Sequence, residues 1–267
     1  FEMSAAVQAG IPFGIKFAHL HGGEITIGAI DNIFRHQITV ASVLHFTSTN
    51  LSENRVSQLI NKNNNIFTVG SLSLDEINEF KPLKKELFFN KFKIPTKDYA
   101  LITFHPDTTE TEKNEYNANE MAKALKNISQ KLFLVITMPN ADTMGSKYRD
   151  VINELKNQIT DNLICIENFG KENYFNAMFY SKVLIGNTSS GIIEAASFGK
   201  YVVNVGNRQE GRIKSENVID SEFNEQNIIH AVDLAMSKGF YHGANVYYRK
   251  DSANLIINKL KNFNENL

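Results

Sequence analysis

The sequence predicts an α/β protein built from doubly wound, mostly parallel sheets. Short β-rich runs alternate with longer stretches of helical periodicity along most of the 267 residues. The expected strands are nearly continuous apolar runs, which is typical of parallel strands covered by helices on both faces. Hydrophobic residues make up 42% of the chain, enough for one large core or two moderate ones.

Each expected strand is a short apolar run such as A100-L-I-T-F104, and each expected helix has apolar residues at helical spacing. In chain order, the expected strands are residues 15–21, 44–47, 66–69, 100–104, 132–137, 163–166, 183–185 and 201–205. The expected helices include residues 28–42, 110–129, 146–159, 172–181, 191–198 and about 252–264. A polar, charge-rich stretch at residues 71–87 interrupts this alternation, so we place a domain boundary there.

Three parts follow from that boundary. Residues 1–72 hold three strand candidates, which is few for a complete doubly wound domain, so this first domain is expected to be incomplete in the chain. Residues 73–250 hold five strand candidates and form the second expected domain. Residues 251–267 form a C-terminal helix that could pack back on the first part.

Composition argues against several classes of partner. The chain has 28 Lys and Arg against 29 Asp and Glu, without basic runs, so neither nucleic acid nor an acidic membrane is expected as a partner. No apolar run approaches the roughly 20 residues that span a bilayer, and no signal peptide is visible. The single cysteine, Cys165, lies in an apolar run, which fits a reducing cytoplasm.

The run V183-L-I-G-N-T-S-S-G191 ends a strand in small and hydroxyl residues just before a helical pattern. Such a turn presents backbone N–H groups and hydroxyl donors to a phosphate, and small residues allow close approach. An ordinary strand–turn–helix with serine caps explains the same spacing equally well. Glu194 follows about one turn later, where a ribose diol would suit it, although a solvated helix residue is the alternative.

Other expected strand ends also carry polar side chains. His105 follows a strand in T103-F-H-P-D107, Asn140 lies in M138-P-N-A-D142, and Arg208 and Arg212 lie in V205-G-N-R-Q-E-G-R212. Histidine and the forked arginine side chain both suit phosphate, whereas unliganded turn residues and surface arginines are the alternatives. Because parallel strands end at one edge of a sheet, several such residues together favour a nucleotide site.

The densest polar cluster lies in H19-L-H-G-G-E-I-T-I-G-A-I-D-N-I-F-R-H36. A strand delivers His19 and His21, a Gly-Gly turn brings Glu24 near, and Asp31 follows at an expected helix. Acid/base catalysis needs two ionisable groups facing one substrate, which this cluster could supply. The alternative is a core histidine, a loop glutamate and a surface ion pair. Alternate strand residues point to opposite faces, so His19 and His21 are not expected to share a metal.

These motifs together resemble the UDP-N-acetylglucosamine 2-epimerases, most closely the hydrolysing type that feeds sialic-acid synthesis. The resemblance covers almost the whole chain, with the motifs in family order. It implies a glycosyltransferase-B arrangement of two Rossmann-like domains, with the ligand in the cleft between them. It also implies elimination of UDP from UDP-GlcNAc and hydration of the glycal to N-acetylmannosamine, without a metal or other cofactor. A homodimer is common among similar enzymes.

Site roles carry over from the resemblance by motif. It places the diphosphate near His105, Thr188, Ser189 and Arg208, with Ser190 adjacent, Glu194 on the ribose and Asn140 facing the nucleotide. It places Asp31 at the sugar. Many relatives have a glutamate where this chain has His21, which leaves open whether His21 or Glu24 is the acid/base group. An Asp-Arg pair and an arginine-bearing, glycine-rich loop of the family are expected upstream of Phe1.

Alternatives remain from the sequence alone. A glycosyltransferase of the same fold would transfer the sugar to an acceptor, and a non-catalytic module would only bind the UDP-sugar. The sequence does not distinguish UDP-GlcNAc from a related UDP-diacetamido sugar, because both share the nucleotide half of the site.

Overall fold

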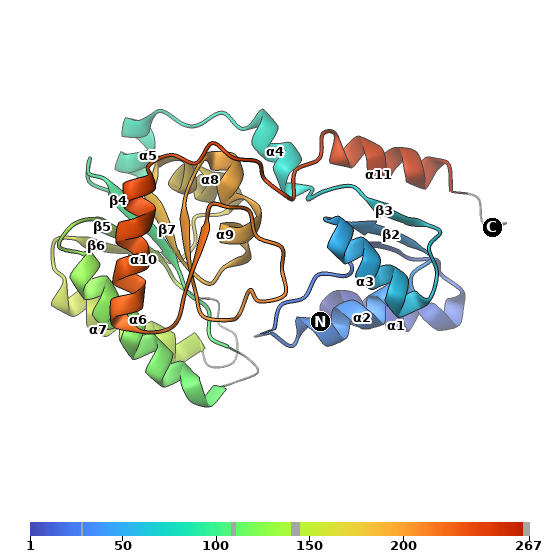
Figure 1. The fold of residues 1–267 in the computed structure, drawn as a ribbon, viewed down its shortest axis with the longest axis horizontal. Helices are drawn as coiled ribbons and strands as arrows, with labels where there is room; N and C mark the ends of the chain where they lie inside the picture. Colours follow the sequence, from blue (N-terminus) through green and yellow to red (C-terminus); the bar gives the residue numbers. More distant parts are fainter. Residues whose placement is uncertain (28, 108–110, 140–144, 264–267) are drawn as a thin grey trace. The chain divides into compact units, whose positions relative to one another are not determined.

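The computed structural model describes residues 1–27, 29–107, 111–139 and 145–263. It divides the chain into two compact units, each with its own parallel sheet (Figure 1). Unit 1 comprises Phe1–Phe80, Gly211–Ile213 and Asn245–Leu267, and unit 2 comprises Lys81–Glu210 and Lys214–Ala244. The first division thus falls after Phe80, within eight residues of the boundary placed by composition, and the chain returns to unit 1 twice.

Unit 1 has a three-stranded parallel sheet in the order β1-β2-β3. Its strands are β1 (Ala18–Leu20), β2 (Leu44–Thr47) and β3 (Ile66–Thr68). Its helices are α1 (Glu2–Gly10), the 3₁₀ turn η1 (Ile11–Phe13), α2 (Asp31–Ala41), α3 (Asn50–Ile60), α4 (Ser73–Glu79) and α11 (Ser252–Lys261).

The last helix belongs to the core of unit 1. Ile256 of α11 is buried in one cluster with Leu44 and Phe46 of β2 and with Val69, which directly follows β3. The Ser252 hydroxyl at the start of this helix donates to the Val69 carbonyl at 2.7 Å. Residues at the end of the chain therefore complete a core that begins near its start.

Unit 2 has a six-stranded sheet in the order β6-β5-β4-β7-β8-β9, and every neighbouring pair is parallel. Its strands are β4 (Tyr99–Thr103), β5 (Phe133–Thr137), β6 (Leu163–Ile166), β7 (Val183–Gly186), β8 (Val202–Val205) and β9 (Val218–Ser221). Its helices are α5 (Lys85–Phe92), α6 (Asn114–Ile128), α7 (Gly145–Gln158), α8 (Lys171–Tyr180), α9 (Ser189–Ile193) and α10 (Glu225–Lys238), with 3₁₀ turns η2 (Thr111–Lys113) and η3 (Ala195–Phe198).

Helices cover both faces of the unit 2 sheet, as the apolar strands predict. Ala100 and Ile102 pack toward α6, α7 and α10, which lie together in Figure 1. Tyr99, which directly precedes Ala100, packs against Phe89 of α5 and donates to the Ala177 carbonyl of α8. Successive residues of β4 therefore serve opposite faces, so the whole strand is buried.

The order of strands creates a topological switch point between β4 and β7. From β4 the chain continues to β5 on one side, and β7 pairs with β4 on the other. Ligands of open α/β sheets bind beyond the carboxyl ends of strands at such a point. His105 follows β4 and Thr188 follows β7, so the switch point brings two expected phosphate ligands to the same edge.

The eight predicted strands are confirmed, with their ends shifted by at most three residues, whereas β9 was not predicted. That strand is short, polar and half-exposed at the sheet edge, so it lacks the apolar signal of the buried strands. The helix expected at residues 191–198 is shorter, because α9 ends at Ile193 and a 3₁₀ turn follows. Within the described residues, every helix is too short or too polar to cross a bilayer.

Candidate functional site

His21 is presented by a backbone conformation that few side chains adopt. Strand β1 ends at Leu20, and His21 follows with φ of 60°, in the left-handed region. Its N–H still donates to the Phe46 carbonyl of β2, so the residue stays fixed to the sheet. The strand alternation expected for His19 and His21 therefore ends one residue early, and the His21 side chain is about one-third exposed.

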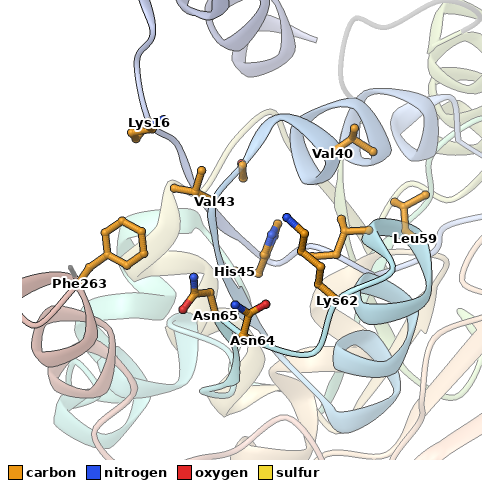
Figure 2. Close-up of a pocket in the computed structure, with 11 residues that line it drawn as sticks. Lys16, Val40, Val43, His45, Leu59, Lys62, Asn64, Asn65 and Phe263 are labelled. Atoms are coloured by element: carbon orange, nitrogen blue, oxygen red, sulfur yellow. The ribbon is translucent and has the colours of Figure 1, made fainter. Parts of the chain in front are cut away.

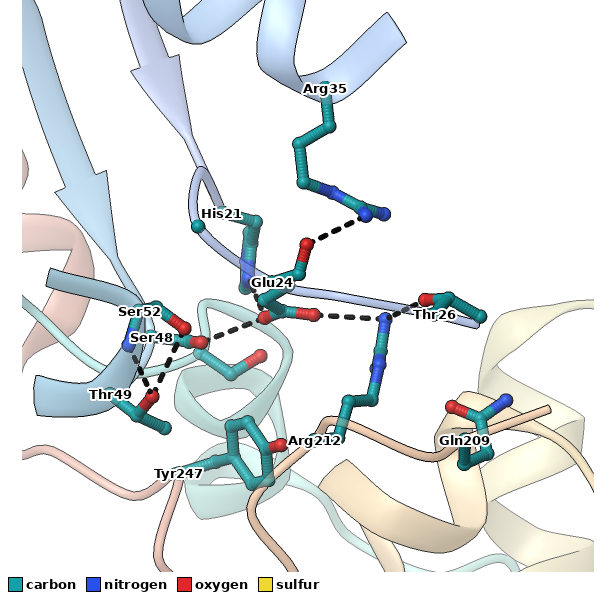
Figure 3. A network of polar contacts seen from close by, with 12 residues as sticks. His21, Glu24, Thr26, Arg35, Ser48, Thr49, Ser52, Gln209, Arg212 and Tyr247 are labelled. Atoms are coloured by element: carbon teal, nitrogen blue, oxygen red, sulfur yellow. Dashed lines mark hydrogen bonds and ion pairs between the residues drawn. The ribbon is translucent and has the colours of Figure 1, made fainter. Parts of the chain in front are cut away.

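Glu24 is the centre of a polar network within unit 1 (Figure 3). Its Oε1 is 3.1 Å from His21 Nδ1 and accepts a 2.7 Å hydrogen bond from the Ser48 hydroxyl. Its Oε2 forms a 2.9 Å ion pair with Nη2 of Arg212. Glu24 is only 5% exposed and Arg212 only 8%, so this pair is buried.

These partners keep Glu24 ionised despite burial. Burial raises the pKa of the Glu24 carboxyl, but hydrogen bonds from His21 and Ser48 and the charge of Arg212 outweigh it and lower the pKa to about 2. The carboxylate is thus a fixed anion near neutral pH. A group so acidic holds a neighbour in place better than it carries a proton.

Arg35 and Asn32 shape the loop that carries Glu24. Arg35 Nη1 donates to the Glu24 carbonyl and to Asn32 Oδ1, both at 2.9 Å. Asn32 in turn bonds both the N–H and the carbonyl of Thr26. Asp31 is the exposed first residue of α2, and its charge acts on Arg35. All three predicted catalytic residues therefore lie around one loop.

His19 is a core residue. It is 8% exposed, and its Nδ1 is 3.0 Å from the Thr39 hydroxyl of α2. Burial lowers the pKa of His19 to about 4, helped by the nearby charges of His45, Arg35 and His21. His19 is thus a buried, neutral imidazole between the sheet and α2. This is the core histidine that the sequence offered as the alternative to a catalytic role.

In unit 2, Asn187 joins the residues expected to bind a diphosphate. Its side-chain amide clamps the backbone of His105, accepting from the N–H and donating to the carbonyl, both at 2.8 Å. Its own carbonyl accepts from Arg208 Nη1 at 3.3 Å and from Gln209 Nε2 at 2.7 Å. The buried Asn187 thus holds three strand ends together, those of β4, β7 and β8.

The hydroxyl residues begin directly after Asn187. Thr188 is the N-cap of α9, and its side chain accepts from the Ser190 N–H at 3.4 Å. Ser189 is the first helical residue, and Thr188, Ser189 and Ser190 are all partly exposed. His105 and Arg208 both contact Asn187, and Ser189 follows Asn187 by two residues, so these expected phosphate ligands lie on neighbouring strand ends.

Glu194 lies at the end of α9 and is 9% exposed. It acts electrostatically on Tyr174 of α8, whose hydroxyl also interacts with the Thr103 and Ser190 side chains. Burial raises the pKa of Tyr174 to about 12, so this phenol remains a neutral hydrogen-bonding group.

One expectation, for Arg212, is corrected, and another, for Asn140, lies outside the described residues. Arg212 does not join Arg208 in unit 2 but forms its ion pair with Glu24 in unit 1. Its Nε and Nη1 are buried and have no hydrogen-bond partner in the described part of the chain. Asn140 lies outside the described residues. Among His, Cys, Asp and Glu in the described ranges, no group of three or more could hold a metal ion.

Sequence reasoning missed Ser48, Asn187 and Tyr174. Ser48 follows β2 directly, so its position at a strand end was the available signal. Asn187 lies inside the turn that was expected to bind phosphate, but only the hydroxyl residues beside it were predicted as ligands. Tyr174 lies in the middle of α8, and nothing in the local pattern separates it from other helical aromatics.

Comparisons with a family model and with curated proteins all identify 2-epimerases as similar to this chain. A family model described as UDP-N-acetylglucosamine 2-epimerase matches residues 1–261. The UDP-N,N'-diacetylbacillosamine 2-epimerase (hydrolyzing) of Legionella pneumophila is 34% identical over 92% of the chain. The GDP/UDP-N,N'-diacetylbacillosamine 2-epimerase (hydrolyzing) of Campylobacter jejuni is 33% identical over 84% of it. The matches cover 64% and 59% of these two relatives, so the chain spans less than two thirds of their length.

A solved structure shows the same fold. The UDP-GlcNAc 2-epimerase from Neisseria meningitidis, bound to UDP-GlcNAc, superposes with a TM-score of 0.79 at 18% identity. The match covers 97% of this chain and 73% of that one. The α/β arrangement with parallel sheets is therefore the arrangement of these epimerase structures.

Proposed function

The chain belongs to the UDP-N-acetylglucosamine 2-epimerase family. We propose that the protein is a hydrolysing 2-epimerase that acts on a UDP-acetamido sugar. The reaction converts UDP-GlcNAc, or a closely related UDP-diacetamido sugar, to UDP and an N-acetylmannosamine-type sugar. The relatives named as diacetylbacillosamine epimerases make UDP-N,N'-diacetylbacillosamine the second substrate to test.

The observation that carries this proposal is the junction at Asn187. One buried amide and its carbonyl connect His105, Arg208 and the turn that begins α9. Imidazole, guanidinium, hydroxyl and backbone N–H groups all donate to phosphate oxygens. We assign the diphosphate to His105, Thr188, Ser189, Ser190 and Arg208, the ribose to Glu194, and a nucleotide contact to Asn140.

The chemistry requires removal of the proton on sugar carbon 2 and departure of UDP from carbon 1. The C1–O bond breaks as the C1–C2 double bond forms, and the diphosphate takes the electron pair. Donors around the diphosphate stabilise the negative charge of this leaving group. Water then adds to the double bond, its hydroxyl to carbon 1 and a proton to the opposite face of carbon 2, which inverts that centre.

We assign proton transfer to His21 and the positioning of its ring to Glu24. An imidazole is a competent acid/base group, whereas the Glu24 carboxyl, whose pKa is lowered to about 2, stays ionised. Glu24 fixes the Nδ1 side of the imidazole, and Ser48 and Arg212 fix Glu24. Asp31 is the second acid/base group, at the sugar.

The finer architecture is also a proposal. The family resemblance supports a glycosyltransferase-B arrangement in which unit 1 is the C-terminal part of a Rossmann-like domain and unit 2 is the UDP-binding Rossmann-like domain. It likewise supports a cytoplasmic homodimer that needs no metal or other cofactor, without nucleic acid or membrane as a partner.

The test is incubation of the full-length protein with UDP-GlcNAc, and separately with UDP-N,N'-diacetylbacillosamine, in the absence of any acceptor. Equal amounts of UDP and the 2-epimerised free sugar are expected from at least one of them. Transfer that requires an acceptor would instead indicate a glycosyltransferase. Nucleotide binding without turnover would indicate a binding module.

A further inference from the structure

A cavity of about 400 Å³ opens at the amino-terminal edge of the unit 1 sheet (Figure 2). Its walls include Ser42 and Val43 just before β2, and Asn64 and Asn65 just before β3. The Glu24 network follows the carboxyl ends of β1 and β2, at the opposite edge of the same sheet. This cavity is therefore separate from the groups assigned to catalysis.

The polar lining of the cavity is cationic. Lys16 and Lys62 contribute two ammonium groups, and Asn64 and Asn65 contribute amides. The described residues that line the cavity include no carboxylate. Two lysines without an opposing acid in the same hollow attract an anion.

His45 provides the second observation. It belongs to β2, is 1% exposed and lines the cavity, where Figure 2 shows its ring among the basic and amide side chains. Its Nδ1 has no hydrogen-bond partner in the described structure. Burial lowers the pKa of the imidazole, with partial compensation from the backbone of Ser42. A buried polar atom left without a partner costs about 1–3 kcal/mol, which a ligand atom would recover.

The remaining wall is apolar, with Val40, Leu59 and Phe263 beside the charged groups. An inorganic ion alone would leave this part of the hollow unused. A small carbon skeleton attached to the anionic group would cover it and gain from burial.

From this combination we propose that the cavity binds a phosphate group, either free or carried by a small organic ester. Lys16 and Lys62 neutralise its charge, His45 Nδ1 and the Asn64 and Asn65 amides bond its oxygens, and the apolar wall receives the ester carbons. The site is independent of the UDP-binding role assigned to unit 2.

The test is an NMR titration of the protein with inorganic phosphate and, separately, with glycerol 3-phosphate, in a buffer without other polyvalent anions. Saturable shifts are expected for the His45 imidazole and for the amides of Asn64 and Asn65. Lys16→Gln and Lys62→Gln should each weaken binding by at least about fivefold, because each removes a charge-assisted contact. Both lysines are exposed, so the variants should fold.

Lys250→Gln is the matched control, because Lys250 is an exposed lysine of unit 1 that does not line the cavity. Tighter binding of glycerol 3-phosphate than of inorganic phosphate would identify an ester as the ligand, and equal binding would identify free phosphate. The proposal is overturned if His45 does not shift, if the control weakens binding as much as Lys62→Gln, or if the shifts fall only around His105 and Ser189.

Discussion

Glu24 shows how one buried carboxylate is kept charged by its neighbours. Burial raises the pKa of Glu24, and His21, Ser48 and Arg212 together outweigh that effect. Because its folded-state pKa is depressed, the carboxylate stabilises the fold above its ordinary pKa of 4.5. That contribution is lost as the pH falls from about 4.5 to about 2, and the shift corresponds to about 3 kcal/mol.

Glu24→Gln should therefore lower the melting temperature at pH 7 and flatten its dependence on pH below 4.5. Removing one partner also leaves the buried Arg212 charge uncompensated, which adds to the loss at neutral pH. Melting temperatures from pH 7 to pH 2.5 measure both effects. Glu79→Gln, at an exposed position of the same unit, should follow the wild-type curve; an unchanged slope in Glu24→Gln would refute the assigned ionisation.

The roles proposed for Asp31 and Glu194 can be separated, because one concerns turnover and the other nucleotide binding. Asp31→Asn should lower turnover by about 100-fold or more and leave UDP affinity nearly intact, because it removes the acid/base group that we propose at the sugar. Glu194→Gln should weaken UDP binding by about tenfold, because an amide is a weaker partner than a carboxylate for a ribose diol. Calorimetric UDP affinity and steady-state rates on the full-length protein test the pair. If Asp31→Asn instead weakened UDP binding and Glu194→Gln instead lowered only turnover, the two proposed roles would be contradicted.

At the scale of elements, the Asn187 junction holds three strand ends in place. Asn187→Ala removes both hydrogen bonds to the His105 backbone and should weaken UDP binding at least tenfold. Asn176→Ala is the control, since Asn176 is equally buried and accepts from the Leu83 N–H. Both variants should lose thermal stability, whereas only Asn187→Ala should lose UDP affinity; equal affinities would remove the junction from the site.

Gly186 permits the close contact between β4 and β7. Its φ is 149°, and an added Cβ would lie 1.8 Å from the Thr103 carbonyl oxygen. Gly186→Ala should therefore displace the turn that follows, with a large fall in melting temperature and loss of UDP binding. Gly170→Ala is the comparison, because Gly170 has φ of 67° but open space around it. Gly170→Ala should lower the free energy of unfolding by only about 1 kcal/mol, which is the cost of the backbone strain. Similar losses in the two variants would contradict the steric argument.

At the scale of the whole molecule, the sequence predicted what depends on local pattern. Buried strands such as β4 and β7 carry continuous apolar signals, and they are neighbours in the sheet, so the turns that follow them lie at the same edge. The exposed edge strand β9 carried no such signal. The partner of Arg212 depends on a chain return from unit 2 to unit 1, which no local pattern encodes. The Asn187 bonds to His105 span 82 residues and could not be assigned from spacing either.

The central claim is that His105, Ser189 and Arg208, gathered by Asn187, receive the diphosphate of a UDP-sugar. A crystal structure of the full-length protein soaked with UDP tests it most directly. The account predicts phosphate oxygens within hydrogen-bond distance of all three residues, with the ribose hydroxyls at Glu194. A nucleotide bound elsewhere, with these three side chains untouched, would contradict it.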